Sequence, residues 1–269
     1  MASRTKQKEE ARARRLAEER ERAERARRQR RMQMVAGIVV GAVIVVVALV
    51  LISTGGAGNS KETGLQTGTK ASATSNSVDQ MLAGIPQAGN RLGKPSAPVT
   101  MTYYGDYECP VCQAFTLDGG FPQLVANDVR AGKVKVVYRS FCTATCGGPG
   151  LSVFNTQQVA GLAAGKQNLF WHFTELFYRE QGKEDTGYVN ESYLTSLAQQ
   201  TTGLNVSAWQ SARSDPNLLA QINSDQSSAK QIGVGGTPTL IFSGPKGQAA
   251  ASQAVPTYSQ LESDIKQVS

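Results

Sequence analysis

Residues 99–112 read Val-Thr-Met-Thr-Tyr-Tyr-Gly-Asp-Tyr-Glu-Cys-Pro-Val-Cys, a strand-like apolar run that leads into two cysteines two residues apart. Runs of β-branched and aromatic residues favour a strand, and a proline just inside a helix start predicts that a helix begins at the cysteines. Cys109 and Cys112 could then open and close as a redox-active disulfide, or they could contribute to a metal site. The rest of the chain helps to decide between these two interpretations.

The net positive charge of the chain lies at its N-terminus. Residues 1–31 hold 13 Lys and Arg and 6 Asp and Glu, whereas residues 32–269 hold 15 of each sign. The balanced remainder gives no support for a nucleic-acid-binding surface, and we expect no nucleic-acid partner. Residues 1–33 are predicted to be a basic tail, in which alternating Glu and Arg favour a solvated helix.

An uncharged apolar run follows the tail over residues 34–52. Nineteen helical residues span roughly 28 Å, which is about the hydrocarbon thickness of a bilayer. The run predicts a single transmembrane helix that is retained. A cleaved signal peptide is the alternative, although its apolar region is usually shorter, roughly 7–15 residues.

The distribution of basic residues predicts the orientation of this helix. Nine Lys and Arg lie in residues 14–33, against two in the 20 residues that follow the apolar run. The positive-inside rule therefore places the N-terminus in the cytoplasm, with the tail of residues 1–33 on that side of the cell membrane. We expect the rest of the chain to be extracytoplasmic, in an oxidising compartment where cysteines serve as disulfides.

Residues 53–77 are rich in Gly, Ser, Thr, Ala and Asn and are predicted to be a flexible linker, so the folded domain is expected over residues 78–269. The patterns predict an α/β sandwich with a helical insertion over about residues 150–232. Strands are expected near residues 81–87, 99–106, 134–139, 239–242 and 249–255. Helices are expected over residues 112–130, 153–164, 168–181, 191–200, 206–213, 217–232 and 258–268.

Three segments resemble the DsbA-like branch of the thioredoxin-fold oxidoreductases. Asp106-Tyr-Glu-Cys-Pro-Val-Cys112 is similar to the dithiol motif, and Gly233-Val-Gly-Gly-Thr-Pro-Thr-Leu-Ile-Phe242 is similar to the segment with the family's cis-proline. Phe170-Trp-His-Phe-Thr-Glu-Leu-Phe177 resembles the aromatic helix of the family's insertion. The resemblance covers about residues 80–269 and implies a thioredoxin fold with an inserted helical subdomain, preceded here by the single transmembrane helix.

The physical chemistry of the dithiol assigns a different part to each cysteine. Only a thiolate attacks a disulfide, and Cys109 is expected just before the first helical turn, where unpaired N–H groups and the helix dipole stabilise a negative charge. Pro110 fits that turn because its missing N–H would have no partner there. We therefore predict that Cys109 is the nucleophile and that Cys112, more deeply buried, is the resolving thiol.

The resemblance implies a cis Thr237–Pro238 bond packed against the dithiol, which leaves backbone groups of Thr237 free to pair with a substrate segment. A trans proline that starts a strand is the alternative. Strongly oxidising relatives carry His where this chain has Val111, which offers neither a hydrogen-bond donor nor a charge. Glu108 and Asp106 add negative charge nearby. We therefore expect a milder oxidant, whose Cys109 is less acidic than the thiol of DsbA, with its pKa of about 3.5.

Cys142 and Cys146 form a second pair in a Thr/Gly/Pro loop, which predicts a structural disulfide in an oxidising compartment. A second redox relay is the alternative. Four cysteines could also make a zinc site, but the 29-residue gap between the pairs disfavours it. His172 stands between two aromatic residues and is expected to pack rather than to catalyse. We expect neither a metal nor a cofactor.

The resemblance implies a thiol:disulfide oxidoreductase that introduces disulfides into exported proteins and acts as a monomer. Its substrates would be exported protein thiols, and its reoxidant a quinone-linked membrane partner, DsbB-like or related to vitamin K epoxide reductase. A disulfide reductase or isomerase on the same fold is one alternative. A non-catalytic, membrane-tethered binding or chaperone module is the other, and the intact Cys109 and Cys112 argue against it.

Overall fold

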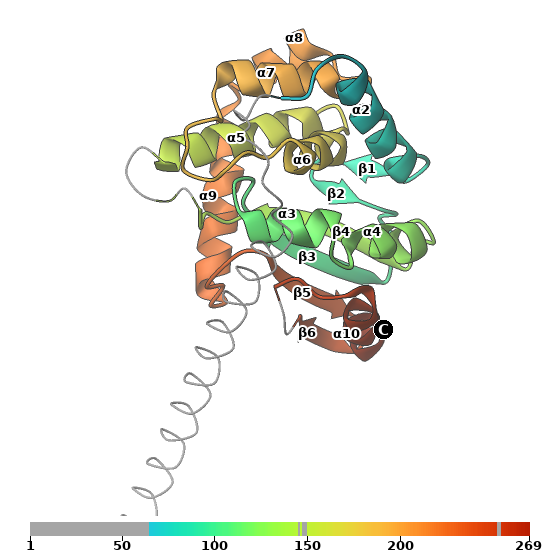
Figure 1. Cartoon of the computed structure of the whole chain (residues 1–269). Coiled ribbons are helices and arrows are strands. Elements are labelled where there is room, and N and C mark those ends of the chain that lie inside the picture. Colours follow the sequence, from blue (N-terminus) through green and yellow to red (C-terminus); the bar gives the residue numbers. More distant parts are fainter. Residues whose placement is uncertain (1–64, 145, 147–149, 252–253) are drawn as a thin grey trace, which may run out of the picture. The chain divides into compact units, whose positions relative to one another are not determined.

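In a computed structural model the chain is described over residues 65–144, 146, 150–251 and 254–269. These residues form a six-stranded sheet of order β1-β2-β4-β3-β5-β6 (Figure 1). The strands are β1 (Gln87–Ala88), β2 (Arg91–Leu92), β3 (Val99–Gly105), β4 (Val134–Ser140), β5 (Thr239–Gly244) and β6 (Gly247–Ala250).

The three central strands bring three loops to one edge of the sheet. β3 runs parallel to β4, with Gly105 opposite Ser140, so the loops that follow these two strands leave the sheet side by side. β5 runs antiparallel to β3, with Thr239 opposite Tyr104, so the loop that precedes β5 arrives at the same edge. The dithiol, the second cysteine pair and the Thr237–Pro238 segment lie in or next to these loops.

Helices surround the sheet, and most of them lie in the insertion. The insertion holds α5 (Gly150–Gly165), α6 (Phe170–Arg179), α7 (Glu191–Gln200), α8 (Val206–Ala212) and α9 (Pro216–Gln231). The other helices are α2 (Gly68–Leu82), α3 (Pro110–Leu117), α4 (Phe121–Leu124) with the π-helical turn η1 (Val125–Val129), and α10 (Tyr258–Val268). In Figure 1, α5 to α8 and α2 lie above α3, β3 and β4, whereas α10 lies below them, beside β5 and β6.

The insertion and the sheet share one hydrophobic core. The alternating burial of β4 turns Val134, Val136 and Tyr138 inward, as expected for a strand with one packed face. The aromatic helix α6 reaches this core, because Trp171 stacks on Phe121 with ring centroids 5.5 Å apart. The insertion is therefore packed against the rest of the domain and not merely connected to it.

The predicted helices of the insertion and the C-terminal helix are confirmed. Two predictions at the start of the domain are wrong. Where a strand was expected near residues 81–87, the chain first completes helix α2, which ends at Leu82. Strand β1 starts only at Gln87, the last residue of the expected range. Residues 68–77 of the expected linker are helical, because Ala71, Ser75, Val78 and Leu82 bury one face of α2.

Two further element boundaries differ from the predictions. The helix expected over residues 112–130 breaks at Gly119 and Gly120, between α3 and α4. A Cβ at Gly120 would lie 2.7 Å from backbone atoms of Thr257 and Tyr258, so the close approach of α10 requires glycine there. The last strand lies earlier than expected and is shorter, over Gly247–Ala250 instead of residues 249–255.

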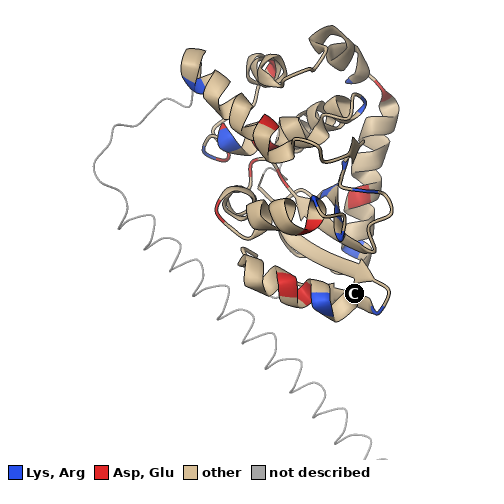
Figure 2. Ribbon diagram, turned by 90° about the vertical axis from the view of Figure 1, so that its right-hand side faces the viewer, with Lys and Arg blue, Asp and Glu red and all other residues tan. Residues whose placement is uncertain are grey.

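The charges of the described residues are mixed. Figure 2 shows basic and acidic residues interspersed over the helices and loops, in keeping with the balanced composition of this part of the sequence. The predicted tail over residues 1–33 and the predicted transmembrane helix over residues 34–52 lie outside the described residues. Within the part of the chain that is described, no helix combines the length and the apolar character needed to cross a membrane.

Candidate active site

The dithiol lies where β3 gives way to α3. Cys109 is the N-cap residue of α3 and Pro110 occupies its first turn, as the sequence predicts. Cys109 is 6% exposed and Cys112 is fully buried, and both are free thiols. Only Cys109 is therefore within reach of another protein's sulfur.

The surroundings of the two thiols move their pKa values in opposite directions. A hydrogen bond from Cys112, helped by the Thr237 side chain and the amides of Cys112 and Val111, lowers the pKa of Cys109 to about 7 against the effect of burial. Burial raises the pKa of Cys112, and the neighbouring Cys109 raises it further. This asymmetry suits Cys109 as nucleophile and Cys112 as resolving thiol.

The loop before β5 closes the site from the other side. The Thr237–Pro238 peptide bond is cis, in agreement with what the resemblance implies. The Cys109 Sγ donates to the carbonyl oxygen of Thr237 at 3.4 Å. The two segments singled out from the sequence, 128 residues apart at Cys109 and Thr237, are thus in direct contact.

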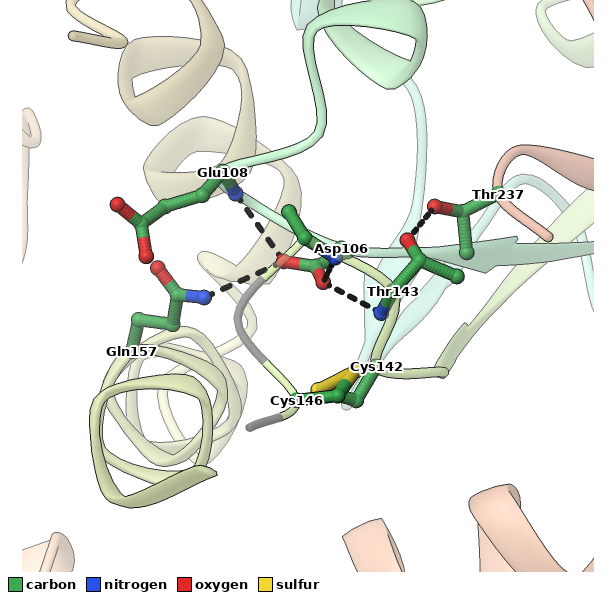
Figure 3. The surroundings of a disulfide bond; sticks show 8 residues. Asp106, Glu108, Cys142, Thr143, Cys146, Gln157 and Thr237 are labelled. Carbon is green, nitrogen blue, oxygen red and sulfur yellow. Dashed lines mark hydrogen bonds between the residues drawn. A yellow bond between two sulfur atoms is a disulfide. The ribbon is translucent and has the colours of Figure 1, made fainter. Parts of the chain in front are cut away.

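A buried carboxylate joins the dithiol loop to the second cysteine pair (Figure 3). Asp106 Oδ2 accepts from the amides of Thr143 and Ala144, each at 2.9 Å. Its Oδ1 accepts from the amide of Glu108 at 3.1 Å and from Gln157 Nε2 at 3.3 Å. The sequence suggested Asp106 only as a nearby negative charge, whereas the structure makes it the junction of two loops and α5.

Glu108 also differs from the expectation that it adds a full negative charge near the dithiol. Its side chain is buried, and Oε2 has no hydrogen-bond partner among the described residues. Burial, followed by the charge of Asp106, raises the pKa of Glu108 to about 7. Near neutral pH this carboxyl is thus partly protonated, and it disfavours the Cys109 thiolate less than a full negative charge would.

The second cysteine pair lies in the loop after β4. Cys142 and Cys146 form a disulfide with their Cα atoms 5.6 Å apart (Figure 3). Cys142 is buried and Cys146 is exposed. The structural role expected for this disulfide, with a redox relay as the alternative, stays a prediction.

Two glutamines tie the insertion to the dithiol, and no motif in the sequence indicates either of them. Gln181, just after α6, donates through Nε2 to the carbonyl oxygens of Tyr107 at 2.5 Å and Cys109 at 3.2 Å. Gln113 of α3 donates through Nε2 to the carbonyl oxygen of Tyr178 at 2.7 Å. Such bonds depend on where side chains fall in space, and no spacing along the chain reveals them.

His172 lies away from the dithiol loop. Its Nδ1 is 2.9 Å from Gln87 Nε2, and its Nε2 is 3.7 Å from Asp79 Oδ1. Burial lowers its pKa, against the effect of Asp79. These contacts join α6 to β1 and α2 and give His172 a packing role.

Comparison with known proteins identifies the family of this chain. Residues 87–266 match the family described as Thioredoxin. The chain belongs to the thioredoxin family. It is 28% identical over 154 residues to disulfide bond formation protein D of Bacillus subtilis, an alignment that spans 55% of this chain and 65% of that protein, just under two thirds of its length.

Solved structures support the fold. BdbD from Bacillus subtilis superimposes with a TM-score of 0.57 at 22% identity, over 68% of this chain and 96% of that one. Wolbachia pipientis α-DsbA1 gives a TM-score of 0.54 at 18% identity, over 70% of this chain and 92% of that one. These likenesses confirm the predicted thioredoxin fold with its helical insertion.

Proposed function

We propose that this chain is an extracytoplasmic thiol:disulfide oxidoreductase that introduces disulfides into exported proteins. The observation that carries the proposal is the contrast between the two thiols: Cys109 is 6% exposed with its pKa lowered to about 7, and Cys112 is fully buried with its pKa raised. Such a pair can accept a substrate thiolate at one sulfur and release the other.

The chemistry proceeds in two exchanges that transfer two electrons from the substrate to the enzyme. A substrate thiolate attacks Cys109 Sγ of the oxidised pair, the bond between Cys109 and Cys112 breaks, and Cys112 leaves and takes up a proton. A second substrate thiolate then attacks the substrate sulfur of the mixed disulfide. Cys109 leaves as a thiolate, which its lowered pKa favours, and the substrate keeps the new disulfide.

The setting of this reaction belongs to the same proposal. A transmembrane helix over residues 34–52 would tether the domain to the outer face of the cell membrane, with the N-terminus in the cytoplasm. Exported protein thiols would be its substrates. A quinone-linked membrane protein, DsbB-like or related to vitamin K epoxide reductase, would reoxidise Cys109 and Cys112 and remove the two electrons.

The acidity of Cys109 also favours a second candidate function. A pKa of about 7 is that of thioredoxin's nucleophile rather than that of DsbA. A disulfide reductase or isomerase of the same compartment would suit such a thiol, and the reduction potential of the pair decides between the two directions.

Trapping tests the proposal. In cells, full-length chain with Cys112→Ala should accumulate mixed disulfides through Cys109, because the resolving thiol is absent. The matched control is the double variant Cys109→Ala/Cys112→Ala, which keeps Cys142 and Cys146 and should trap nothing. Exported proteins with several cysteines among the trapped species support the oxidase, whereas equal trapping by the control would refute a function based on Cys109.

A further inference from the structure

One pair of hydroxyl groups connects the second cysteine loop to the dithiol site. Thr143 Oγ1, between Cys142 and Cys146, lies 2.5 Å from Thr237 Oγ1 (Figure 3). Thr237 in turn accepts from Cys109 Sγ through its carbonyl oxygen. Thr143, in the loop after β4, is thus hydrogen-bonded to Thr237, which contacts the reacting sulfur of Cys109.

Thr143 is exposed, yet its backbone is held. Its amide and that of Ala144 donate to the buried Asp106 carboxylate, and the disulfide between Cys142 and Cys146 closes the loop around it. A free surface threonine would spread over its rotamers, and fixing it costs conformational entropy. Here the loop has already ordered the residue, so its hydroxyl is available in one place.

Either hydroxyl of this pair can donate, so the direction of the bond depends on what else Thr237 contacts. A threonine hydroxyl has one hydrogen to donate and two lone pairs to accept with. Thr237 contacts the Cys109 sulfur at 3.4 Å through its carbonyl oxygen, and its side chain lowers the pKa of Cys109, which is the effect of a hydroxyl whose hydrogen turns toward the sulfur. With its hydrogen so engaged, the Thr237 oxygen accepts from Thr143, and each bond of such a chain strengthens the next.

We propose that Thr143 is a positioning residue of the dithiol site, which orients the Thr237 hydroxyl toward the Cys109 sulfur and so stabilises the thiolate. This inference rests on the proposed function, since it concerns the same two cysteines. By favouring the reduced pair, Thr143 makes the Cys109–Cys112 disulfide a stronger oxidant. In this arrangement Asp106 and the Cys142–Cys146 disulfide contribute by holding the backbone of Thr143.

Three variants of the full-length chain test the proposal. Thr143→Val keeps the shape of the side chain and removes the hydroxyl, and Thr143→Ser keeps the hydroxyl. The control is Thr74→Val on α2, which also removes a bond between two side chains, that from Thr74 Oγ1 to Gln66 Oε1 at 3.1 Å.

The readout is the equilibrium of each cysteine pair with glutathione. Alkylation followed by trypsin places Cys109 and Cys112 in the peptide of residues 92–130, since Lys94 precedes proline, and Cys142 and Cys146 in that of residues 140–166. Mass spectrometry then reports the two pairs separately. The pH dependence of iodoacetamide alkylation at Cys109 gives its acidity in the same samples.

Thr143→Val should shift the Cys109–Cys112 equilibrium about twofold to tenfold toward the disulfide, the range expected for one hydrogen bond. It should slow alkylation of Cys109 at pH 6 by a similar factor. Thr143→Ser and Thr74→Val should stay near the parent. In a Thr237→Val background the Thr143→Val change should add nothing, because the hydroxyl it orients is gone.

A Thr143→Val protein with the parent equilibrium overturns the proposal, and so does an equal shift in the Thr237→Val background. If Thr143→Ser shifts the Cys109–Cys112 equilibrium as far as Thr143→Val does, the proposal is also overturned, because packing and not the hydroxyl would then matter. The proposed function fails separately, if the full-length Cys112→Ala variant traps no client through Cys109. The glutathione equilibrium is measured without any client and does not depend on that result.

Discussion

Replacing Asp106 by asparagine probes the junction between the dithiol loop and the second cysteine loop. The carboxylate accepts from two amides through Oδ2 and from an amide and a side-chain amide through Oδ1. Asparagine has one acceptor oxygen, and its NH₂ group is a donor only. Whichever way the new side chain turned, its NH₂ group would face at least one buried backbone amide, which is also a donor.

The magnitude follows from these contacts. The shorter bonds to Thr143 and Ala144 should keep the remaining oxygen, so the Glu108 amide loses its acceptor, whereas Gln157 can turn its unpaired Oε1 toward the new NH₂ group. Each buried donor left unpaired costs about 1–3 kcal/mol. Part of this is offset, because burial raises the pKa of Asp106 and the neutral amide avoids that desolvation. We expect a net loss of about 2 kcal/mol in the free energy of unfolding.

The assay is denaturant unfolding of the oxidised full-length chain near neutral pH, with thermal unfolding beside it. About 2 kcal/mol corresponds to a fall of about 4–8 °C in Tm for a domain of this size. Asp118→Asn is the control, because Asp118 is an exposed carboxyl at the end of α3. A change of less than about 0.5 kcal/mol at Asp106 would refute the reasoning, since surface substitutions already reach that value.

Three further predictions concern other groups. Glu175 is fully buried, and burial raises its pKa to about 7 in the folded chain, from 4.5 in the unfolded chain. The stability that the protonated side chain contributes is therefore fully present below pH 4.5 and is lost as the pH rises through 7. Glu175→Gln should therefore increase the free energy of unfolding at pH 8 by about 3 kcal/mol relative to its effect at pH 4, and an equal effect at both pH values contradicts this. Alkylation of Cys109 in the reduced chain should follow a titration with a midpoint near pH 7, and a midpoint near 3.5 would contradict a mild oxidant. Removing the second disulfide by Cys142→Ala/Cys146→Ala should cost about 2 kcal/mol in the free energy of unfolding and leave trapping through Cys109 intact, whereas loss of trapping would favour a relay.

The sequence predicted those features that depend on neighbours along the chain. The strand before Cys109, the proline in the first turn of α3 and the helices of the insertion follow from local patterns, and all are present. The contact between Cys109 and Thr237 was expected from the resemblance alone. No pattern in the residues themselves indicates that two segments so far apart should meet.

The features that were missed depend on burial. The polar composition of residues 68–77 suggested a linker, but a helix with a few small or apolar residues on one face gains enough from packing to form. Asp106 and Glu108 look like two surface charges in the sequence. Their desolvation, which changes their effect on Cys109, becomes visible only when the neighbouring loops and α5 are in place.

The amides of Thr143 and Ala144 have a consequence for the dynamics of this edge of the sheet. Backbone amides in surface loops usually exchange their hydrogen with solvent quickly, because opening such a loop costs little free energy. These two amides donate instead to a carboxylate that is fully buried. Hydrogen exchange at these two amides therefore requires the loop of Thr143 and Ala144 to separate from Asp106. The exchange rate reports how often this loop, which lies beside the dithiol site, opens in the folded protein.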